Sequence, residues 1–231
     1  MIIGINGYAG SGKDTIAAII QYLLCENKEQ LNLEMVVKYY SNHQWWLEEQ
    51  SGWEIKKFAG KLKTIANILT GIPEQKFEDR EFKLQNMPAE WTRHGIPMTV
   101  REFLQRLGTD GLRNNLCDNV WVNSLMVDYK PTHDVEFAYT ENGSRIPVEF
   151  NTSYPNWIIT DCRFNNEATA IKNKNGIIIR VDRPGVKPVN KHVSETALDN
   201  WNFDYKIANV SDLIALAFTV ENILKKENIL K

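Results

Sequence analysis

The chain has 231 residues, of which 43% are hydrophobic and 24% charged, and its formal net charge is −2. This size suits one α/β domain with insertions, and the near-neutral charge argues against bulk binding of nucleic acid. No apolar run approaches the ~20 residues needed to cross a bilayer, so we expect no membrane role. Cys25, Cys117 and Cys162 lack metal-ligand spacing, which favours reduced thiols and a cytoplasmic protein.

The first predicted elements flank a glycine-rich loop. Residues 1–5 are an uncharged, β-branched run typical of a buried strand, and residues 16–24 continue as a helix. Between them, in GYAGSGKDT, Gly7, Gly12 and Lys13 meet the pattern G-x-x-x-x-G-K. Glycines let a loop turn its N–H groups toward an anion, and the helix start adds the positive end of its dipole. We therefore predict a phosphate-binding loop; the alternative is a glycine-rich turn without a ligand.

One position of the loop departs from the usual pattern. Where such loops carry Ser or Thr to hold Mg²⁺, this chain has Asp14, followed by Thr15. Either the Asp14 carboxylate meets the metal or the Thr15 hydroxyl takes that role. We expect the phosphates of a nucleotide to contact the residues of the loop and the helix start, namely Gly10, Ser11, Gly12, Lys13, Asp14 and Thr15.

The next stretch predicts a strand and then a helix. The run 35–40 is apolar enough for a second strand, and the tryptophans that follow, Trp45, Trp46 and Trp53, favour packing over base stacking. From residue 55 apolar residues recur at helical spacing as far as Gly71, with Lys61 near the start. The lysines there either reach an anion or form a solvated face.

Residues 73–98 are polar and carry Arg80, Lys83, Arg93 and His94. This composition suits a mobile, lid-like segment over an anionic substrate, or a plain surface excursion.

A capping box of Thr99 and Glu102 starts a further helix, on which Arg101 and Gln105 share a face. We expect Gly108–Gly111 to interrupt that helix. Another helix follows over residues 119–129, with Trp121 and Leu125 facing inward.

Residues 131–155 predict an inserted β-hairpin, because two alternating runs flank the turn signal Asn142-Gly143. We assign no chemistry to it.

The last third of the chain predicts strands alternating with helices. Strands are expected at 157–160, 177–181 and 205–207, with a helix opening at Asn165 and a final helix capped by Ser211. The apolar positions expected to face the core on this final helix are Leu213, Ile214, Leu216, Ala217, Val220 and Leu224.

This alternation predicts an α/β fold with a parallel sheet covered by helices on both faces. Ligands in such sheets bind outside the carboxyl ends of the strands, where Gly7, Asp161 and Arg183 fall. Arg163 and Glu167 follow Asp161 closely; they either bind substrate or metal at the strand tip, or form an ion pair at a helix start.

Five motifs, together with Trp121, His192 and Glu195, resemble the bacteriophage deoxynucleoside monophosphate kinase family in order along nearly the whole chain. They are SGKDT (11–15), KFAGKLK (57–63), VREFLQRLGTD (100–110), IITDCRFNNEA (158–168) and VDRPG (181–185). The resemblance implies a single P-loop kinase domain over 1–231, located in the host cytoplasm if viral. It implies transfer of the γ-phosphate of ATP to a deoxynucleoside monophosphate, with Mg²⁺.

The resemblance also implies roles for individual residues. Lys13, Arg101, Asp161 and Arg163 form the expected catalytic set, with Asp14 and Thr15 toward the metal. Residues expected to bind substrate are Lys61, Arg101, Glu102, Gln105, Gly108, Thr109, Trp121, Asp161, Arg163 and Glu167.

Two other functions stay open from the sequence. One is a kinase of another small phosphate, such as phosphomevalonate, and the other is a P-loop module that binds nucleotide and a partner protein without acting as a kinase. A homodimer is the common prior for an enzyme of this kind.

Overall fold

The computed structural model describes residues 1–188, 192–210 and 212–230, and the side chains of 134–136 and 148–151 lie outside this description. The chain divides into two compact units. Unit 1 comprises Met1–Lys56 and Asp128–Lys231, and unit 2 comprises Lys57–Val127.

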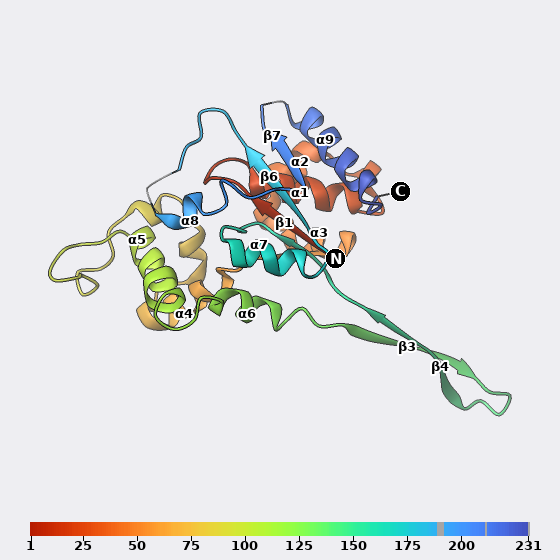
Figure 1. Cartoon of the computed structure of the whole chain (residues 1–231). Helices are drawn as coiled ribbons and strands as arrows, with labels where there is room; N and C mark the ends of the chain where they lie inside the picture. The colour runs from red at the N-terminus through yellow and green to blue at the C-terminus, as the bar shows by residue number, and fades with distance from the viewer. Residues whose placement is uncertain (189–191, 211, 231) are drawn as a thin grey trace. The chain divides into compact units, whose positions relative to one another are not determined.

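Unit 1 is built on a parallel five-stranded sheet in the order β2-β5-β1-β6-β7 (Figure 1). The strands are β1 (Ile2–Asn6), β2 (Trp53–Lys56), β5 (Asn156–Ile159), β6 (Ile177–Asp182) and β7 (Tyr205–Ala208). All of the pairings are parallel. The predicted parallel sheet is therefore confirmed, and its central strand β1 leads directly into the glycine loop.

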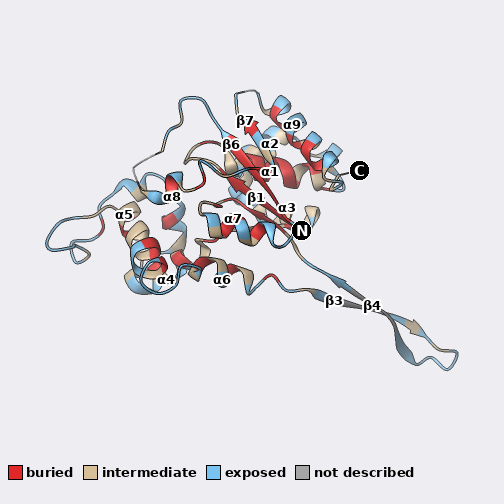
Figure 2. Ribbon diagram, in the orientation of Figure 1, coloured by how far each residue is buried: buried red, intermediate tan, exposed pale blue. Residues whose placement is uncertain are grey.

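Helices cover both faces of this sheet because alternate residues of each strand point to opposite sides. Ile3 and Ile5 of β1 pack in the main core with α1 (Lys13–Leu24) and α9 (Leu213–Lys226). On the other face lies α7 (Asn165–Lys172), drawn in front of the sheet in Figure 1. It approaches so closely that a Cβ on Gly4 would lie 2.6 Å from Ile171 Cδ1. In Figure 2 the central strands β1 and β6 are coloured as buried along almost their whole length.

The predicted strand over 35–40 is wrong, because this run lies in two helices, α2 (Leu33–Lys38) and α3 (Tyr40–Ser51). Leu33 and Val37, four residues apart, pack against the core as one helical stripe, whereas Met35 is exposed. The Asn32 side chain caps α2 by accepting the Met35 N–H at 3.0 Å. The edge strand of the sheet is instead β2.

The three tryptophans of this region have different environments. Trp53 is buried in β2, as the packing interpretation predicts, Trp46 is half-buried, and Trp45 is 66% exposed.

The final helix matches its predicted apolar stripe except at one position. Leu216, Ala217, Val220 and Leu224 are buried, whereas Ile214 is exposed together with Phe218 one turn later. The helix is capped by Asp212, whose carboxylate accepts the Ala215 N–H at 2.8 Å. Ser211, the predicted cap, lies outside the described residues.

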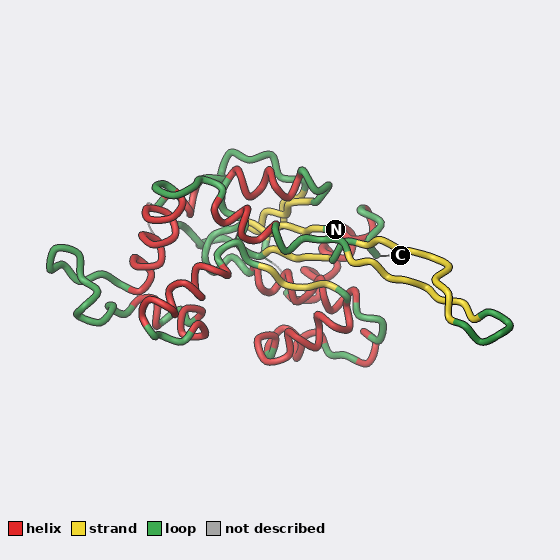
Figure 3. The backbone as a smooth tube through the Cα atoms, turned by 90° about the horizontal axis from the view of Figure 1, so that it is seen from below, coloured by secondary structure: helices red, strands yellow, loops and turns green. Residues whose placement is uncertain are grey.

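The predicted hairpin is confirmed as an antiparallel pair, β3 (Thr132–Tyr139) and β4 (Arg145–Ser153), with Gly143 in the turn at a φ of 81°. It extends away from the five-stranded sheet (Figures 1 and 3). At its base the ring of Tyr129 stacks on Tyr154 and meets Trp157 edge-on, with centroid distances of 5.2 and 4.8 Å. The other short helices of unit 1 are η1 (Lys28–Gln30) and α8 (Val193–Thr196).

Unit 2 is helical in the part that the structure describes. It contains α4 (Gly60–Thr70), η2 (Glu74–Glu78), η3 (Phe82–Leu84), α5 (Val100–Gln105), η4 (Arg106–Arg113) and α6 (Val120–Met126). Its core gathers Ala66, Phe77, Met87, Val100 and Phe103. The segment 73–98 therefore contributes Phe77 and Met87 to packing, and its proposed closing motion stays a prediction.

Two predicted signals in unit 2 are confirmed and one is wrong. Gly71 ends α4 in the left-handed region, and the Thr99 hydroxyl accepts the Glu102 N–H at 3.1 Å. Gly108–Gly111 does not interrupt the helix: η4 continues α5 as a π-helical segment. A side chain at Gly108 would clash with Leu62, because its Cβ would lie 2.8 Å from Leu62 Cδ2. The glycine thus serves close packing rather than termination.

Among the described residues, no helix combines the length and apolar character required to span a bilayer.

Candidate functional site

The glycine loop between β1 and α1 requires glycine at two positions. Gly7 has a φ of 153°, and a Cβ there would lie 2.5 Å from the Val181 carbonyl oxygen. Gly12 has a φ of 102°, and a Cβ there would lie 2.4 Å from Asn209 Nδ2. Side chains rarely adopt such backbone angles, and both sites lack space for one. The loop is thus held tightly against the carboxyl ends of the neighbouring strands.

Lys13 opens α1 and turns back over this loop. Its ammonium group donates hydrogen bonds to the carbonyl oxygens of Gly7 and Tyr8, at 2.7 and 2.9 Å. The pKa of Lys13 is lowered to about 8, chiefly by burial and also by the positive charge of Arg163, while Asp14, Glu195 and Asp161 oppose this shift. Phosphate oxygens, which carry negative charge, would be stronger acceptors for this ammonium group than the two neutral carbonyl oxygens.

The same electrostatic couplings show which predicted residues the structure brings together. Lys13 lies within range of Asp14, Asp161 and Arg163, as the strand-tip argument predicts, and also of Glu195. The nearness of Glu195 to these residues could not be read from spacing along the chain, because Glu195 lies 32 residues beyond Arg163.

Ser11 is buried in the loop, and its hydroxyl oxygen has no hydrogen-bond partner within the described part of the chain. Its backbone is well held: the Ser11 N–H donates to the Tyr8 carbonyl at 3.1 Å, and Asn209 Nδ2 donates to the Ser11 carbonyl at 2.8 Å. A buried hydroxyl without a partner in a glycine-rich loop of this kind is suited to donate to an anion.

Asn209 was not predicted. It directly follows β7, and its own N–H donates to the Asp182 carbonyl at 2.7 Å, which fixes the side chain against Gly12. Its place just beyond the carboxyl end of a parallel strand is the signal that could have identified it.

Arg180 is a second residue that sequence reasoning missed. This buried arginine of β6 donates to Asn6 Oδ1 at 2.6 Å, and Asn6 Nδ2 donates to the Cys162 carbonyl at 2.7 Å. Its guanidinium also lies 4.6 Å from the centre of the Tyr8 ring. The network ties together the ends of β1, β5 and β6 beneath the loop. Arg183, which the sequence placed at this edge, is exposed.

Glu167 and Arg163 do contact one another, but through the backbone. The buried Glu167 carboxylate accepts the N–H groups of Arg163 and Phe164, at 2.8 and 3.1 Å, as a cap on α7. The Arg163 guanidinium lies 3.0 Å from Glu195 in α8. The alternative of a helix-start ion pair between Arg163 and Glu167 is therefore wrong, since Arg163 pairs with a distant element, while substrate roles for these residues stay predictions.

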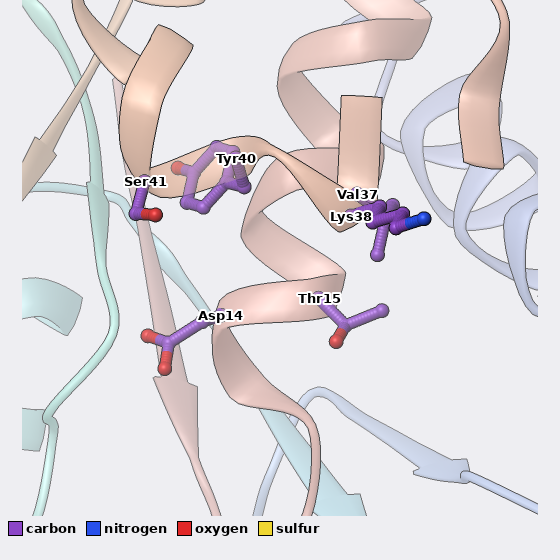
Figure 4. Close-up of a pocket in the computed structure, with 6 residues that line it drawn as sticks. All are labelled: Asp14, Thr15, Val37, Lys38, Tyr40 and Ser41. Atoms are coloured by element: carbon purple, nitrogen blue, oxygen red, sulfur yellow. The ribbon is translucent and has the colours of Figure 1, made fainter. Parts of the chain in front are cut away.

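Oxygen donors suited to a metal occur beside the first turn of α1. Asp14 and Thr15 border a pocket of about 210 Å³ that Val37, Lys38, Tyr40 and Ser41 complete (Figure 4). The two side chains extend to different sides of the helix in this view, so the choice between them stays open. Mg²⁺ in nucleotide sites uses one or two protein oxygens together with phosphates and water. The donors fit that use, and no cluster of three or more His, Cys, Asp or Glu suited to a metal occurs within the described ranges.

Unit 2 carries the remaining predicted residues. Arg101 lies on α5, and its Nε is buried without a hydrogen-bond partner in the part of the chain that the structure describes. Gln105 follows one turn later, and Glu102 pairs with Arg106 at 2.7 Å.

The predicted acceptor-pocket residues of unit 2 pack closely. The Trp121 indole N–H donates to the Gly108 carbonyl at 2.9 Å, and the adjacent Thr109 is buried. Lys61, at the start of α4, donates to the Ser124 carbonyl of α6. Trp121 therefore fixes η4 against α6, which accounts for its burial without requiring a ligand.

Comparison with known proteins gives a consistent family assignment. A family model described as deoxynucleotide monophosphate kinase matches residues 54–220. The chain is 27% identical over 198 residues to a putative deoxynucleotide monophosphate kinase of Acanthamoeba polyphaga mimivirus, covering 86% of this chain and 82% of that protein. It is 28% identical over 142 residues to the deoxynucleotide monophosphate kinase of Enterobacteria phage T4, covering 62% of this chain and 49% of that protein. The chain thus spans about half the length of the phage relative.

Proposed function

The chain belongs to the deoxynucleotide monophosphate kinase family, and from this premise we propose that it transfers the γ-phosphoryl group of ATP to a deoxynucleoside 5′-monophosphate. The products are ADP and the deoxynucleoside diphosphate. The proposal rests on the position of Lys13, the first residue of α1. Its ammonium group folds over the glycine loop and lies near Asp161 and Arg163.

The residues of unit 1 suit the donor nucleotide. Lys13 would leave the carbonyl oxygens of Gly7 and Tyr8 and bind the β- and γ-phosphates, while the N–H groups of the loop and the Ser11 hydroxyl would donate to the same phosphates. Mg²⁺, when bound, would neutralise charge on the phosphates, and Asp14 or Thr15 would hold it. Arg163 adds a second positive charge near the transferred group.

The residues of unit 2 suit the acceptor. Arg101 offers a guanidinium for the acceptor phosphate, and Gly108, Thr109 and Trp121 shape the surface near it. The second pKa of a phosphate monoester is about 6, so the acceptor oxygen is already ionised at neutral pH and no general base is needed. Positioning and charge neutralisation are therefore the main tasks of these side chains.

The proposal is tested by measuring ADP release and diphosphate formation with each of the eight common ribo- and deoxynucleoside monophosphates. Phosphomevalonate is included as an acceptor from a different class. We expect ADP release to depend on a deoxynucleoside monophosphate and to match diphosphate formation one to one. ATP consumption that no monophosphate stimulates would instead support a nucleotide-binding module, and turnover with phosphomevalonate alone would reassign the acceptor.

A further inference from the structure

Unit 2 gathers cations around the carboxylate of Glu78 at the end of η2, and the exposed carboxylate of the adjacent Asp79 lies within electrostatic range of Lys83. Lys57 Nζ lies 3.2 Å from Glu78 Oε1, and Lys63 of α4 forms an ion pair with the same oxygen. Lys83 of η3 donates to the backbone carbonyl of Glu78 at 3.3 Å. Three lysines from separate segments thus meet at one acidic residue.

The cluster carries more positive charge than Glu78 neutralises. The pKa of Lys83 is lowered to about 8, chiefly by burial and also by the charges of Lys63, Arg101 and Lys57, against the opposing effect of Glu78. Arg101 therefore lies within electrostatic range of Lys83. Burial raises the pKa of Glu78, but Lys57 and Lys63 lower it more, so this carboxylate stays ionised.

An ordinary surface ion pair does not account for this arrangement. One carboxylate is sufficient for one or two lysines, and adding further cations nearby costs free energy through like-charge repulsion. Lys63 is only 14% exposed in its side chain, and Arg101 Nε is buried without a hydrogen-bond partner within the described ranges. A site that repels its own charges when empty is stabilised by a multivalent anion.

We propose that Lys63 and Lys83 join Arg101 in binding the phosphate monoester of the acceptor nucleotide. Glu78 is the internal counter-ion of the lysines when the site is empty, and the phosphate displaces it. A phosphate dianion carries up to two charges and three acceptor oxygens, so it satisfies three cations better than one carboxylate does. The identity of the anion as the acceptor rests on the proposed kinase function, whereas the anion site itself rests on the cluster.

The lysines are tested by substitution with glutamine, which keeps a polar side chain of roughly similar size and removes the charge. Lys83→Gln and Lys63→Gln are each expected to raise KM for the deoxynucleoside monophosphate roughly tenfold or more, with KM for ATP unchanged. Lys76→Gln is the matched control, because Lys76 is an exposed lysine of η2, the segment that ends at Glu78. It is expected to leave KM for the monophosphate and KM for ATP unchanged. Melting temperatures show whether each variant is folded. If Lys63→Gln does not fold, the kinetics of Lys83→Gln alone test the proposal.

Glu78→Gln separates a binding role from a merely structural one. Removing a competing carboxylate is expected to tighten binding of the monophosphate several-fold, measured by calorimetric titration of the whole chain, because the lysines are then available to the phosphate. A carboxylate that only stabilises the fold gives the opposite pattern, a lower melting temperature with unchanged or weaker binding, and this would overturn the proposal.

Further titrations distinguish the source of the anion. The deoxynucleoside without its phosphate is expected to show no difference between the wild-type protein and Lys83→Gln, and inorganic phosphate is expected to bind Lys83→Gln more weakly. A rise in KM for ATP alone would assign the cluster to the donor and refute the proposal. Normal monophosphate binding by Lys83→Gln would refute it while leaving the kinase function intact. If no monophosphate stimulates the release of ADP from ATP, this result would count against the kinase function. The titrations would still test the anion site.

Discussion

The guanidinium of Arg163, just beyond β5, lies 3.0 Å from the carboxylate of Glu195 in α8, whose side chain is only 2% exposed. A buried carboxylate requires a cation nearby, so Glu195 holds Arg163 in place. Both charges act on Lys13: that of Arg163 lowers the pKa of the lysine, and that of Glu195 raises it.

This relationship predicts how the pH dependence of the enzyme responds to substitution. In the proposed role Lys13 would bind phosphate as a cation, and the pKa of about 8 means that the free protein loses this charge as pH rises through 8. We therefore expect kcat/KM for ATP to fall above about pH 8. Arg163→Gln removes a neighbouring positive charge, so the fall is expected at higher pH, even though the maximal rate is lower. Glu195→Gln removes a negative charge, so the fall is expected at lower pH.

The measurement is kcat/KM for ATP between pH 6 and 10 at constant ionic strength. Superimposable profiles for the three proteins would show that these charges do not control the ionisation of Lys13.

Lys13→Ala is expected to reduce kcat by roughly 10²–10³ or more, because it removes a fixed charge from the reacting phosphates. The fold should survive, because the hydrogen bonds that the structure describes for the Lys13 ammonium go only to carbonyl oxygens of its own loop. Steady-state rates and circular dichroism check both points. Lys174→Ala, at an exposed position after α7, is the control, and near-normal turnover of Lys13→Ala would refute the role of the loop.

Arg101→Ala is expected to lower kcat/KM for the deoxynucleoside monophosphate by roughly 10²-fold, since charge-assisted hydrogen bonds to a phosphate are among the stronger polar contacts. Arg101→Lys keeps the charge but not the two-pronged geometry, so it should recover only part of the loss. KM for ATP should stay unchanged in both variants. Unaltered monophosphate kinetics would place the acceptor phosphate elsewhere.

Gly12→Ala is expected to destabilise the protein and weaken ATP binding. The new Cβ would lie 2.4 Å from Asn209 Nδ2 at a φ of 102°, and together these cost about 1–3 kcal/mol. Gly10→Ala is the matched control: its φ is 87°, but a Cβ there meets nothing within 4 Å. It should therefore show only the backbone part of the cost.

A double-mutant cycle separates the two contributions. Asn209→Ala alone loses the hydrogen bond to the Ser11 carbonyl, about 1 kcal/mol, but it also makes room for the new Cβ. The free energies of unfolding of Gly12→Ala and Asn209→Ala should thus combine to less than their sum. Additive effects would show that Asn209 and Gly12 are not in contact in solution.

Predictions from local pattern succeeded where short stretches of chain carry their own physical requirement. The uniform apolar runs at β1, β5 and β6 suit only a sheet covered on both faces, and the structure has one. Gly71 and Thr99 end and begin helices because their own conformation or side chain satisfies the adjacent backbone. The glycine loop lies between a strand and a helix as predicted, because its glycines and lysine fall within one short stretch of chain, while phosphate binding there stays a prediction.

Predictions failed where a short pattern fits more than one structure. Six residues at 35–40 are compatible with either a strand or a helix, and the packing of Leu33 and Val37 against the core as one helical stripe decided for a helix. A glycine at position 108 suggests a helix break from sequence alone. Because Leu62 packs closely against it, Gly108 instead allows close contact within a continuous helical segment.

The sequence by itself determined the class of fold, the glycine loop and the residue types at the strand ends, because each depends on neighbours within a few positions. Only the tertiary structure decided the partners of the charges. Arg163 pairs with Glu195, 32 residues away, and Glu78 meets lysines 15 and 21 residues before it. Coulomb energy depends on distance in space and on burial, and neither quantity can be read from spacing along the chain.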